Sequence, residues 1–338
     1  MHISVIICTY RRAGALMDLL GCLAAQTYGD FEVLIVDGSG DDPTVRDKVA
    51  QFVREQRKQL DLRLLTSPKG LTRQRNLGLR EARGELACFF DDDITMGSKF
   101  LAQVVALFGR PEIEGVGGLT GYDTMHYPQP VTFRWKLRRW LGSIPSLEPG
   151  AVDKLGRNVP LEFVRPDAGL VQVGWLPGFC MIYRRAAIGN LCFDEELPTY
   201  GGEDWSFSTQ VGRSWRLVLN TELSLKHHSA PEFRDSSVQR VYQTGFGFGR
   251  AFAKRAEGPR DYMTIARFAW AEIMVDLLAL LKGPSAAKIK IVFARPAGLV
   301  AGFKSGRVLE AEGWGLGRVG RGQTPATNTQ HPTPGEEL

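Results

Sequence analysis

Residues 85–93 read Glu-Leu-Ala-Cys-Phe-Phe-Asp-Asp-Asp, and this stretch decides the fold class. Its apolar run has the length and composition of a buried β-strand. The strand runs directly into Asp91, Asp92 and Asp93, three adjacent carboxylates that repel one another. Alternate residues of an extended chain point the same way, so Asp91 and Asp93 could hold one hard cation through oxygen ligands. A solvated acidic turn is the alternative interpretation.

Upstream of this strand, apolar runs alternate with helical patterns. The patterns predict strands at 3–8, 31–36 and 62–65, and helices at 14–26, 44–60 and 71–83. This alternation predicts an α/β fold with a doubly wound, mostly parallel sheet flanked by helices. Ligands of such sheets bind outside the carboxyl ends of the strands. The polar residues at these ends are Thr9, Tyr10, Arg11, Asp37 and the three aspartates.

Two features near the predicted strand ends suit a nucleotide. The Asp37 carboxylate could accept a hydrogen bond from a base or a ribose hydroxyl, although an Asp before Gly38 also fits an Asx turn. Gly70 precedes a helix whose first amides, together with Arg73 or Arg75, could face phosphate groups. For either arginine, a solvent-exposed helix face is the alternative.

Downstream of residue 97 the alternation weakens. Residues 122–170 are rich in Pro, Gly, Trp and Arg, which predicts an irregular insertion with one short helix at 132–141. Residues 173–184 predict a strand with a Pro-Gly interruption. The remaining predicted elements are a strand at 216–228 and helices at 203–215, 236–256 and 262–282.

Two downstream segments carry candidate catalytic groups. Glu203 and Asp204 stand at a predicted helix start, where an acid either caps the helix or serves as a general base. Strand alternation places Leu223, Leu225 and His227 on one face, so His227 could be a further ligand of the same metal. A packing role is the alternative for this histidine, and the adjacent His228 leaves the choice between the two open.

The charge is unevenly distributed along the chain of 338 residues. The net charge of +5 comes from 42 basic and 37 acidic residues, and we predict no nucleic-acid partner from it. Residues 1–230 hold 27 of each sign, and residues 231–338 hold 15 basic and 10 acidic residues. Lysines and arginines alternate with apolar residues between 277 and 309, and again with aromatic residues between 134 and 140. This composition predicts a peripheral segment attracted to an anionic membrane, and a solvated basic face packed on the rest of the protein is the alternative.

The cysteines and the N-terminus predict a cytoplasmic protein. Five cysteines without a CxxC pair indicate buried free thiols in a reducing compartment. The start MHISVIICTYRR predicts a core strand rather than a signal peptide. The apolar stretch 262–281 contains Arg267, Glu272 and Asp276, which predicts an amphipathic helix and not a membrane span.

The set of motifs, taken together, resembles the family 2 inverting glycosyltransferases of the GT-A fold. In chain order they are Cys-Thr-Tyr-Arg-Arg, Leu-Ile-Val-Asp-Gly-Ser, Gly-Leu-Thr-Arg-Gln-Arg-Asn, Asp-Asp-Asp, Trp-Leu-Pro-Gly-Phe, Gly-Gly-Glu-Asp-Trp and Lys-His-His. The resemblance covers residues 1–230 as a catalytic domain. It leaves residues 231–322 as a helical, basic C-terminal extension and residues 323–338 as a disordered tail.

The resemblance implies a role for each matching position. The implied contacts to a nucleotide-sugar, most often a UDP-sugar, are Thr9, Tyr10, Arg11, Asp37, Arg73, Arg75, Asn76, Asp91 and Asp92. The implied acceptor-side residues are Trp175, Gly178, Gly202 and Trp205. Asp91, Asp93 and His227 would hold Mn²⁺ or Mg²⁺. Asp204, or less favourably Glu203, would be the catalytic base.

The implied activity is inverting, hexosyltransferase-like transfer from a nucleotide-sugar to a hydroxyl. The acceptor would be a saccharide, a lipid-linked saccharide or a polysaccharide precursor. The alternative is a non-catalytic nucleotide-sugar-binding protein or membrane adaptor with the same fold, which could lack the metal-binding acids or the base. A dinucleotide-binding oxidoreductase is disfavoured because no GxGxxG motif follows the first strand.

Overall fold

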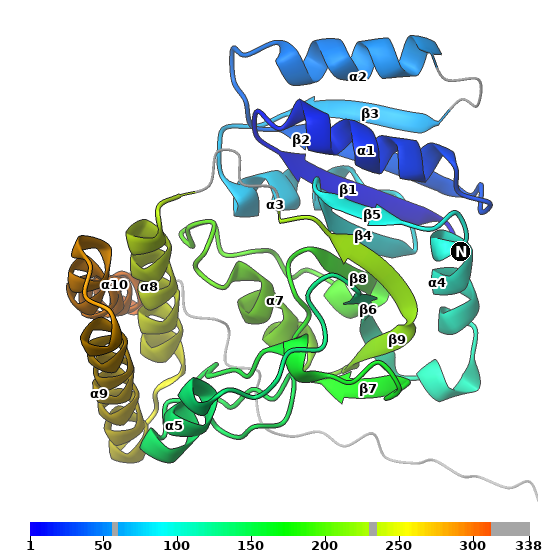
Figure 1. Ribbon diagram of the computed structural model, residues 1–338. Helices are drawn as coiled ribbons and strands as arrows, with labels where there is room; N and C mark the ends of the chain where they lie inside the picture. The colour runs from blue at the N-terminus through cyan, green and yellow to red at the C-terminus, as the bar shows by residue number, and fades with distance from the viewer. Residues whose placement is uncertain (56–59, 230–234, 312–338) are drawn as a thin grey trace, which may run out of the picture.

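A nine-stranded mixed sheet forms the centre of the computed structural model, which describes residues 1–55, 60–229 and 235–311 (Figure 1). The strand order is β3-β2-β1-β4-β8-β6-β9-β5, and β7 pairs with β9 off this path. The strands are β1 (Ile3–Thr9), β2 (Phe31–Asp37), β3 (Asp61–Thr66), β4 (Leu86–Asp91), β5 (Ile94–Met96), β6 (Val116–Asp123), β7 (Leu170–Val173), β8 (Cys180–Arg184) and β9 (Arg216–His227).

The first half of the sheet is parallel, as the sequence predicts. β1 pairs in parallel with β2 and β4, and β2 pairs in parallel with β3. The register sets Thr9 beside Asp37 and Cys8 beside Asp91, so the carboxyl ends of three strands meet at one edge. The crossover helices are α1 (Ala13–Ala24), α2 (Thr44–Glu55) and α3 (Leu71–Glu81). Residues 56–59 of the predicted helix 44–60 lie outside the described residues.

Helices cover both faces of the sheet. On one face, α1, α2 and α4 (Phe100–Phe108) pack on the side chains of Ile3, Val5 and Ile7. On the other face, α3, α6 (Arg185–Ile188) and α7 (Glu203–Val211) pack around Ile6, Leu34 and Val36. Apolar side chains on both faces explain why β1 and β2 are continuous apolar runs rather than alternating ones. The predicted doubly wound α/β fold is therefore confirmed.

The second half of the sheet departs from the prediction. Residues 173–184 are not one strand, because β7 pairs antiparallel with β9 whereas β8 pairs antiparallel with β4 and β6. Pro177 lies in the turn between β7 and β8, where it need not donate to a ladder. β5 and β6 have no counterpart among the predicted strands. The three glycines of β6 hide its strand pattern, and a Cβ on Gly118 would lie 2.7 Å from Tyr183 and Leu217.

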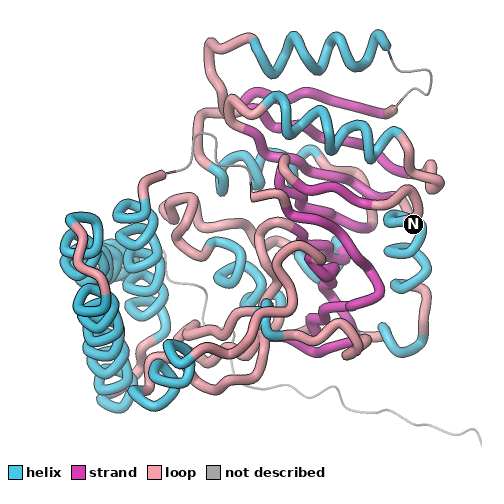
Figure 2. Tube along the Cα trace, in the orientation of Figure 1, coloured by secondary structure: helices cyan, strands magenta, loops and turns pink. Residues whose placement is uncertain are grey.

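Four helices gather beside the sheet on the side away from α2 (Figures 1 and 2). They are α5 (Phe133–Leu141), which is the short helix predicted in the insertion, α8 (Ser237–Arg255), α9 (Pro259–Lys282) and α10 (Ala286–Ala311). α8 and α10 approach closely, since a Cβ on Gly249 would lie 2.1 Å from the Leu299 carbonyl and one on Gly302 would lie 1.9 Å from the Phe246 carbonyl. The 245–249 glycine run is thus a helix-packing face and not a phosphate loop.

The cysteines and the long apolar helix test two further expectations. All five cysteines are free, and Cys88 and Cys180 are buried. Cys192 is exposed, so its predicted burial is wrong; the next residue, Phe193, takes the core position instead. In the described part of the chain, no helix combines the length and apolar character that a membrane crossing requires.

Candidate functional site

A cleft of about 570 Å³ opens at the carboxyl ends of β1 and β4. The start of α7 and residues of α8 form its opposite wall. Thirteen of the predicted site residues line it: Thr9, Tyr10, Arg75, Asp91, Asp92, Asp93, Trp175, Gly178, Gly202, Glu203, Asp204, Trp205 and His227. Six separate segments of the sequence therefore meet in one cavity, at the strand ends where this fold type binds ligands.

The three aspartates after β4 have different surroundings. Asp92 is buried, accepts a hydrogen bond from Thr9 Oγ1 at 2.8 Å and lies 2.7 Å from Arg12 Nη1. Burial raises the pKa of Asp92 to about 7, against the opposing effects of Arg12 and Thr9. Asp91 is partly exposed, and its carboxylate lies 3.4 Å from Arg75. The expected repulsion is thus relieved by two arginines and by partial exposure.

Asp93 connects β4 to the end of β9. Its Oδ2 lies 2.5 Å from Arg12 Nη2, and its Oδ1 lies 3.3 Å from His227 Nε2. Burial favours a raised pKa for Asp93, but hydrogen bonds and charges from His227 and Arg12 outweigh it and hold the pKa well below its usual range. Burial opposes protonation of His227, and Asp93 with its acidic neighbours raises the pKa of that imidazole. The pair is therefore an ionised carboxylate beside a basic imidazole.

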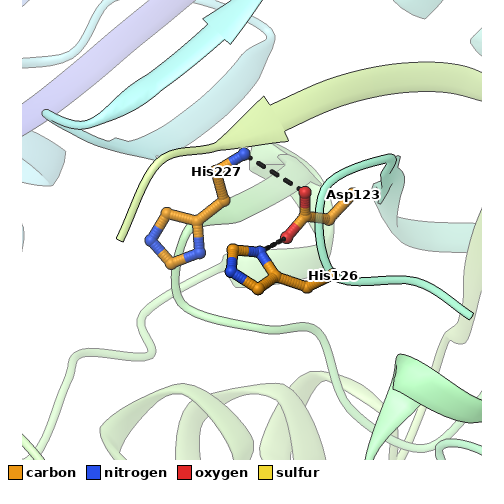
Figure 3. Close-up of side chains that lie close together, drawn as sticks. All are labelled: Asp123, His126 and His227. Atoms are coloured by element: carbon orange, nitrogen blue, oxygen red, sulfur yellow. Dashed lines mark hydrogen bonds and ion pairs between the residues drawn. The ribbon is translucent and has the colours of Figure 1, made fainter. Parts of the chain in front are cut away.

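Asp123 contacts both His227 and His126 (Figure 3). Its Oδ1 accepts a hydrogen bond from the His227 backbone amide at 3.2 Å, and its Oδ2 lies 2.6 Å from His126 Nδ1. The His227 ring also stacks on Phe179, with ring centroids 4.9 Å apart. His228, by contrast, turns to Thr95, 2.8 Å from its hydroxyl. The ring that faces the acids is that of His227.

The residues predicted to bind metal fit a divalent cation. One oxygen each of Asp91 and Asp93 and one nitrogen of His227 lie within 4.8 Å of one another. Arg12 binds Oδ2 of Asp93, which leaves Oδ1 on the side of His227. Two carboxylates and one imidazole form a donor set that suits Mn²⁺ and, with more water ligands, Mg²⁺. Asp123, His126 and His227 form a second group within the same distance, and His227 belongs to both.

A buried arginine connects the opposite wall to the acids. Arg75 Nη1 donates to Glu203 at 3.0 Å, and its Nη2 donates to the Gly178 carbonyl at 3.0 Å and lies 3.4 Å from Asp91. A Cβ on Gly178 would lie 3.1 Å from Arg75, so glycine permits this approach. Burial and the neighbouring Asp204 raise the pKa of Glu203 to about 8 against the opposing charge of Arg75. The Glu203 carboxyl group is engaged by Arg75.

Asp204 is held by backbone amides at the start of α7. Its Oδ2 accepts from the Gly178 amide at 3.0 Å, and its Oδ1 accepts from the Trp205 amide at 2.7 Å. Burial raises the pKa of Asp204, and the two amides and Arg75 act in the opposite direction. An oriented carboxylate with a raised pKa has the properties of a general base near neutral pH.

The aromatic wall of the cleft depends on a left-handed glycine. Gly202 has φ +75°, and a Cβ there would lie 1.8 Å from Trp205 Nε1. Trp205 stacks on Phe248 of α8 with ring centroids 5.4 Å apart. Trp175 donates from Nε1 to the Val159 carbonyl at 3.1 Å. The insertion and the C-terminal helices therefore shape this side of the cleft.

Four predicted nucleotide-binding residues do not line the cleft. The Asp37 side chain accepts from the Ser39 amide at 2.9 Å, which is the Asx turn that was the alternative to its functional role. The Arg11 side chain lies 3.6 Å from Asp42. Arg73 is half exposed, 3.7 Å from Glu195. Asn76 is buried and binds the backbone of Phe193 through both its oxygen and its nitrogen, which fixes the chain leading to α7.

Sequence reasoning missed two residues of the site, the partly buried Arg12 and the buried Gln74. Arg12 binds two of the three aspartates, because Arg11 adopts φ +57° and turns the chain so that Arg12 enters the cleft. Gln74 donates to the carbonyls of Thr9 and Val36 at 2.9 and 2.8 Å and ties α3 to two strand ends. The arginine pair after the strand was a signal for the first, whereas a single glutamine in a helix gave none.

The sequence and the fold both resemble those of known proteins. The family model described as glycosyl transferase family 2 matches residues 4–191, more than half of the chain. The chain belongs to glycosyl transferase family 2. This family 2 glycosyltransferase is 26% identical over 313 residues to the succinoglycan biosynthesis protein ExoM of Rhizobium meliloti (strain 1021), covering 90% of this chain and 93% of that protein. It is 24% identical to the hyaluronan synthase of Pasteurella multocida, covering 70% of this chain but 25% of the synthase.

Solved structures resemble this glycosyltransferase in fold. The mannosyltransferase PcManGT from Pyrobaculum calidifontis, in complex with GDP-Man and Mn²⁺, has a TM-score of 0.54 at 17% identity and covers 92% of this chain and 86% of its own. S. aureus TarS 1-349 in complex with UDP-GlcNAc has a TM-score of 0.51 at 17% identity and covers 93% of this chain and 92% of its own. These likenesses establish the GT-A fold that the motifs predicted.

Proposed function

We propose that this glycosyltransferase catalyses metal-dependent, inverting transfer of a hexosyl group from a nucleotide-sugar to a hydroxyl. The observation that carries the proposal is the meeting of two groups in one cleft. Asp91, Asp93 and His227 stand at the ends of β4 and β9, and Asp204 stands on the facing wall. Single-displacement transfer needs one centre for the leaving diphosphate and a separate base for the acceptor. The position of Asp204 on the wall opposite Asp91, Asp93 and His227 supports these two separate roles.

The leaving-group side consists of Asp91, Asp93 and His227. They would hold Mn²⁺ or Mg²⁺, which neutralises the negative charge of a departing nucleoside diphosphate. Arg12 keeps Asp93 oriented and ionised, and Asp123 fixes the His227 backbone. The complex of PcManGT with GDP-Man and Mn²⁺ supports such a donor–metal pair.

The acceptor side is centred on Asp204. Its carboxylate would take the proton from the attacking hydroxyl, and the amides of Gly178 and Trp205 hold it in place for that step. Glu203 is the weaker choice because its carboxylate is engaged by Arg75. Attack on the face opposite the leaving group inverts the anomeric centre.

The donor is proposed to be a UDP-sugar, with Thr9, Tyr10 and Asp92 on its nucleotide side. The UDP-GlcNAc complex of TarS supports a uridine donor, although the GDP-Man complex shows that the fold also accommodates guanosine. Asp37 Oδ1 accepts from the Ser39 amide, so Oδ2 is the oxygen that would face the base. Arg11, Arg73 and Asn76 would act on the donor indirectly, by fixing the loops around it.

The acceptor is proposed to be a saccharide or lipid-linked precursor of a polysaccharide. The names of the relatives, a succinoglycan biosynthesis protein and a hyaluronan synthase, support this class. The aromatic wall formed by Trp175, Trp205 and Phe248 suits the apolar faces of sugar rings. The five free cysteines are consistent with the proposed cytoplasmic location.

A donor screen tests the proposal. The protein is incubated with UDP- and GDP-sugars and Mn²⁺ or Mg²⁺, and nucleoside diphosphate release and thermal stabilisation are recorded with and without excess chelator. We expect one donor to be hydrolysed slowly, and chelator to abolish the release. The anomeric configuration of a product, read by NMR, should be opposite to that of the donor. Binding without release under all conditions would instead support the adaptor alternative, and retention of configuration would refute inversion.

A further inference from the structure

The helices outside the sheet expose an apolar surface. It consists of Phe133 and Trp140 of α5, Met263, Trp270, Leu278 and Leu281 of α9, and Ile289, Phe293 and Val300 of α10. We call these nine residues the apolar belt. They are nine of the fifteen large hydrophobic side chains that are exposed in the described residues, so the exposure is concentrated and not scattered. Concentrated apolar exposure marks an interaction site.

The helix α9 has its acidic side chains turned inward. Its three acids, Asp261, Glu272 and Asp276, are each at most 5% exposed. All three bind basic side chains from neighbouring segments; Arg138, for example, donates to Glu272 at 2.8 Å. By contrast, Met263, Trp270 and Leu281 are 72%, 53% and 78% exposed. A helix on a water-facing surface normally shows the reverse distribution, so the outer face of α9 suits an apolar medium.

Contacts between the helices hold the three elements of the belt together. Arg267 of α9 donates to the Leu141 carbonyl at the end of α5 at 2.7 Å. At the other end of α9, the Lys282 ammonium lies 5.6 Å from the centre of the Phe133 ring. Arg307 of α10 donates to the Tyr262 hydroxyl at 3.1 Å. α9 therefore contacts both α5 and α10, and the three helices lie on the side of the molecule away from α2 (Figure 1).

Basic side chains surround the belt without exposed acids between them. The exposed basic residues of α5, α9 and α10 are Arg134, Lys136, Arg139, Arg260, Arg267, Lys282, Lys290, Lys304 and Arg307. No acid occurs between residues 277 and 307. Aromatic and aliphatic side chains flanked by lysine and arginine match the boundary between acyl chains and anionic headgroups. A protein partner would need a matching acidic rim, whereas an anionic bilayer supplies one everywhere.

We propose that the apolar belt and its basic rim dock this glycosyltransferase onto an anionic lipid bilayer. The docked orientation brings the cleft near the membrane, because α8 packs on α10 and contributes Thr244 and Phe248 to the cleft wall. A lipid-carried acceptor would then enter from that side. This last step rests on the proposed function, whereas the docking itself does not depend on transfer.

Vesicle co-sedimentation of the full chain tests the proposal. Vesicles of phosphatidylcholine alone are compared with vesicles that also contain phosphatidylglycerol, at low and high salt. We expect binding to the anionic vesicles that weakens with salt. Trp270→Ser with Phe293→Ser should weaken it about 100-fold, and Lys290→Gln with Lys304→Gln about 30-fold. The matched controls, Val53→Ser and Lys48→Gln on α2, change exposed residues outside the belt and should bind like the unmodified protein.

Three results would overturn the docking. The first is an absence of binding to anionic vesicles. The second is that the belt variant, Trp270→Ser with Phe293→Ser, binds these vesicles as tightly as the unmodified protein. The third is that light scattering shows the unmodified protein to be a dimer and the belt variant to be a monomer. The belt would then be the surface that binds a second copy of the chain. Metal-dependent release of nucleoside diphosphate, measured without vesicles on the same variants, should be unchanged. Loss of that release in the unmodified protein would count against the proposed function and not against docking.

Discussion

Replacing Arg75 by alanine tests whether one buried cation holds the two walls of the cleft together. Arg75 is 2% exposed and binds Glu203, Asp91 and the Gly178 carbonyl, which come from three separate segments. Its removal leaves Glu203 buried without its cation, and breaking a buried pair from one side costs about 3–5 kcal/mol. Urea denaturation should therefore show a free energy of unfolding lower by about that amount.

Two further variants make the Arg75 experiment decisive. Arg73 lies two residues earlier on the same helix, but it is half exposed and 3.7 Å from Glu195. Arg73→Ala should change the free energy of unfolding by less than about 0.5 kcal/mol. In a double-mutant cycle, adding Glu203→Gln to Arg75→Ala should raise the free energy of unfolding by about 1–3 kcal/mol relative to Arg75→Ala alone. A loss below about 1 kcal/mol for Arg75→Ala, or no recovery in the cycle, would refute the assigned role.

Three other perturbations have definite outcomes. Gly202→Ala should lower the melting temperature and kcat/KM together, because the left-handed backbone costs about 1–2 kcal/mol and the new Cβ displaces Trp205. Burial would raise the pKa of Glu272, but the charges of Arg138 and Arg295 outweigh it and lower the pKa to about 2. The ionised carboxylate therefore stabilises the fold by about 3 kcal/mol above pH 4.5, and this stabilisation is lost as the pH falls toward 2. Glu272→Gln should flatten this part of a curve of stability against pH. Gly302→Ala should cost about 2 kcal/mol or more by forcing α8 and α10 apart, whereas Gly21→Ala, in open space on α1, should cost nothing in a urea titration. The assigned roles would be contradicted by an unchanged free energy of unfolding for Gly302→Ala, by an unchanged curve of stability against pH for Glu272→Gln, or by a normal kcat/KM for Gly202→Ala.

The first half of the fold could be predicted because its signals are local. Each parallel strand is a short apolar run, and each crossover helix follows directly in sequence. The later strands are different, because β6 is rich in glycine and β5 has three residues. The pairing of β8 with β4 joins segments far apart in the chain, and no local pattern reveals such a partner.

The site could be predicted to the level of segments but not of every side chain. Motif positions correctly brought Asp91, Asp93, Asp204 and His227 to one cleft. They could not distinguish Arg11 from Arg12, because an unusual positive φ decides which side chain turns inward. Nor could they show that Asn76 binds a loop backbone, since that contact depends on the folded position of residue 193.

The exposed face of α9 could be seen only in the structure. The sequence predicts a helix whose apolar stretch 262–281 contains Arg267, Glu272 and Asp276 and directly follows Asp261, which is typical of an ordinary amphipathic helix. In the folded protein these acids meet arginines and a lysine from other segments and turn inward. Because these acids are buried, the apolar side of the helix is left exposed.

The most direct test of the account is the comparison of donor binding and transfer in Asp204→Asn. The amide is nearly isosteric and keeps one of the two hydrogen bonds from backbone amides, so the acids at β4 and the donor side of the cleft should persist. With the donor and metal identified by the screen, we expect the dissociation constant of the donor to stay within about twofold and transfer to fall by about 10²–10⁴-fold. Glu222→Gln, in an exposed acid of β9, is the matched control and should transfer normally. Full transfer by Asp204→Asn would contradict the central claim that this carboxylate is the base.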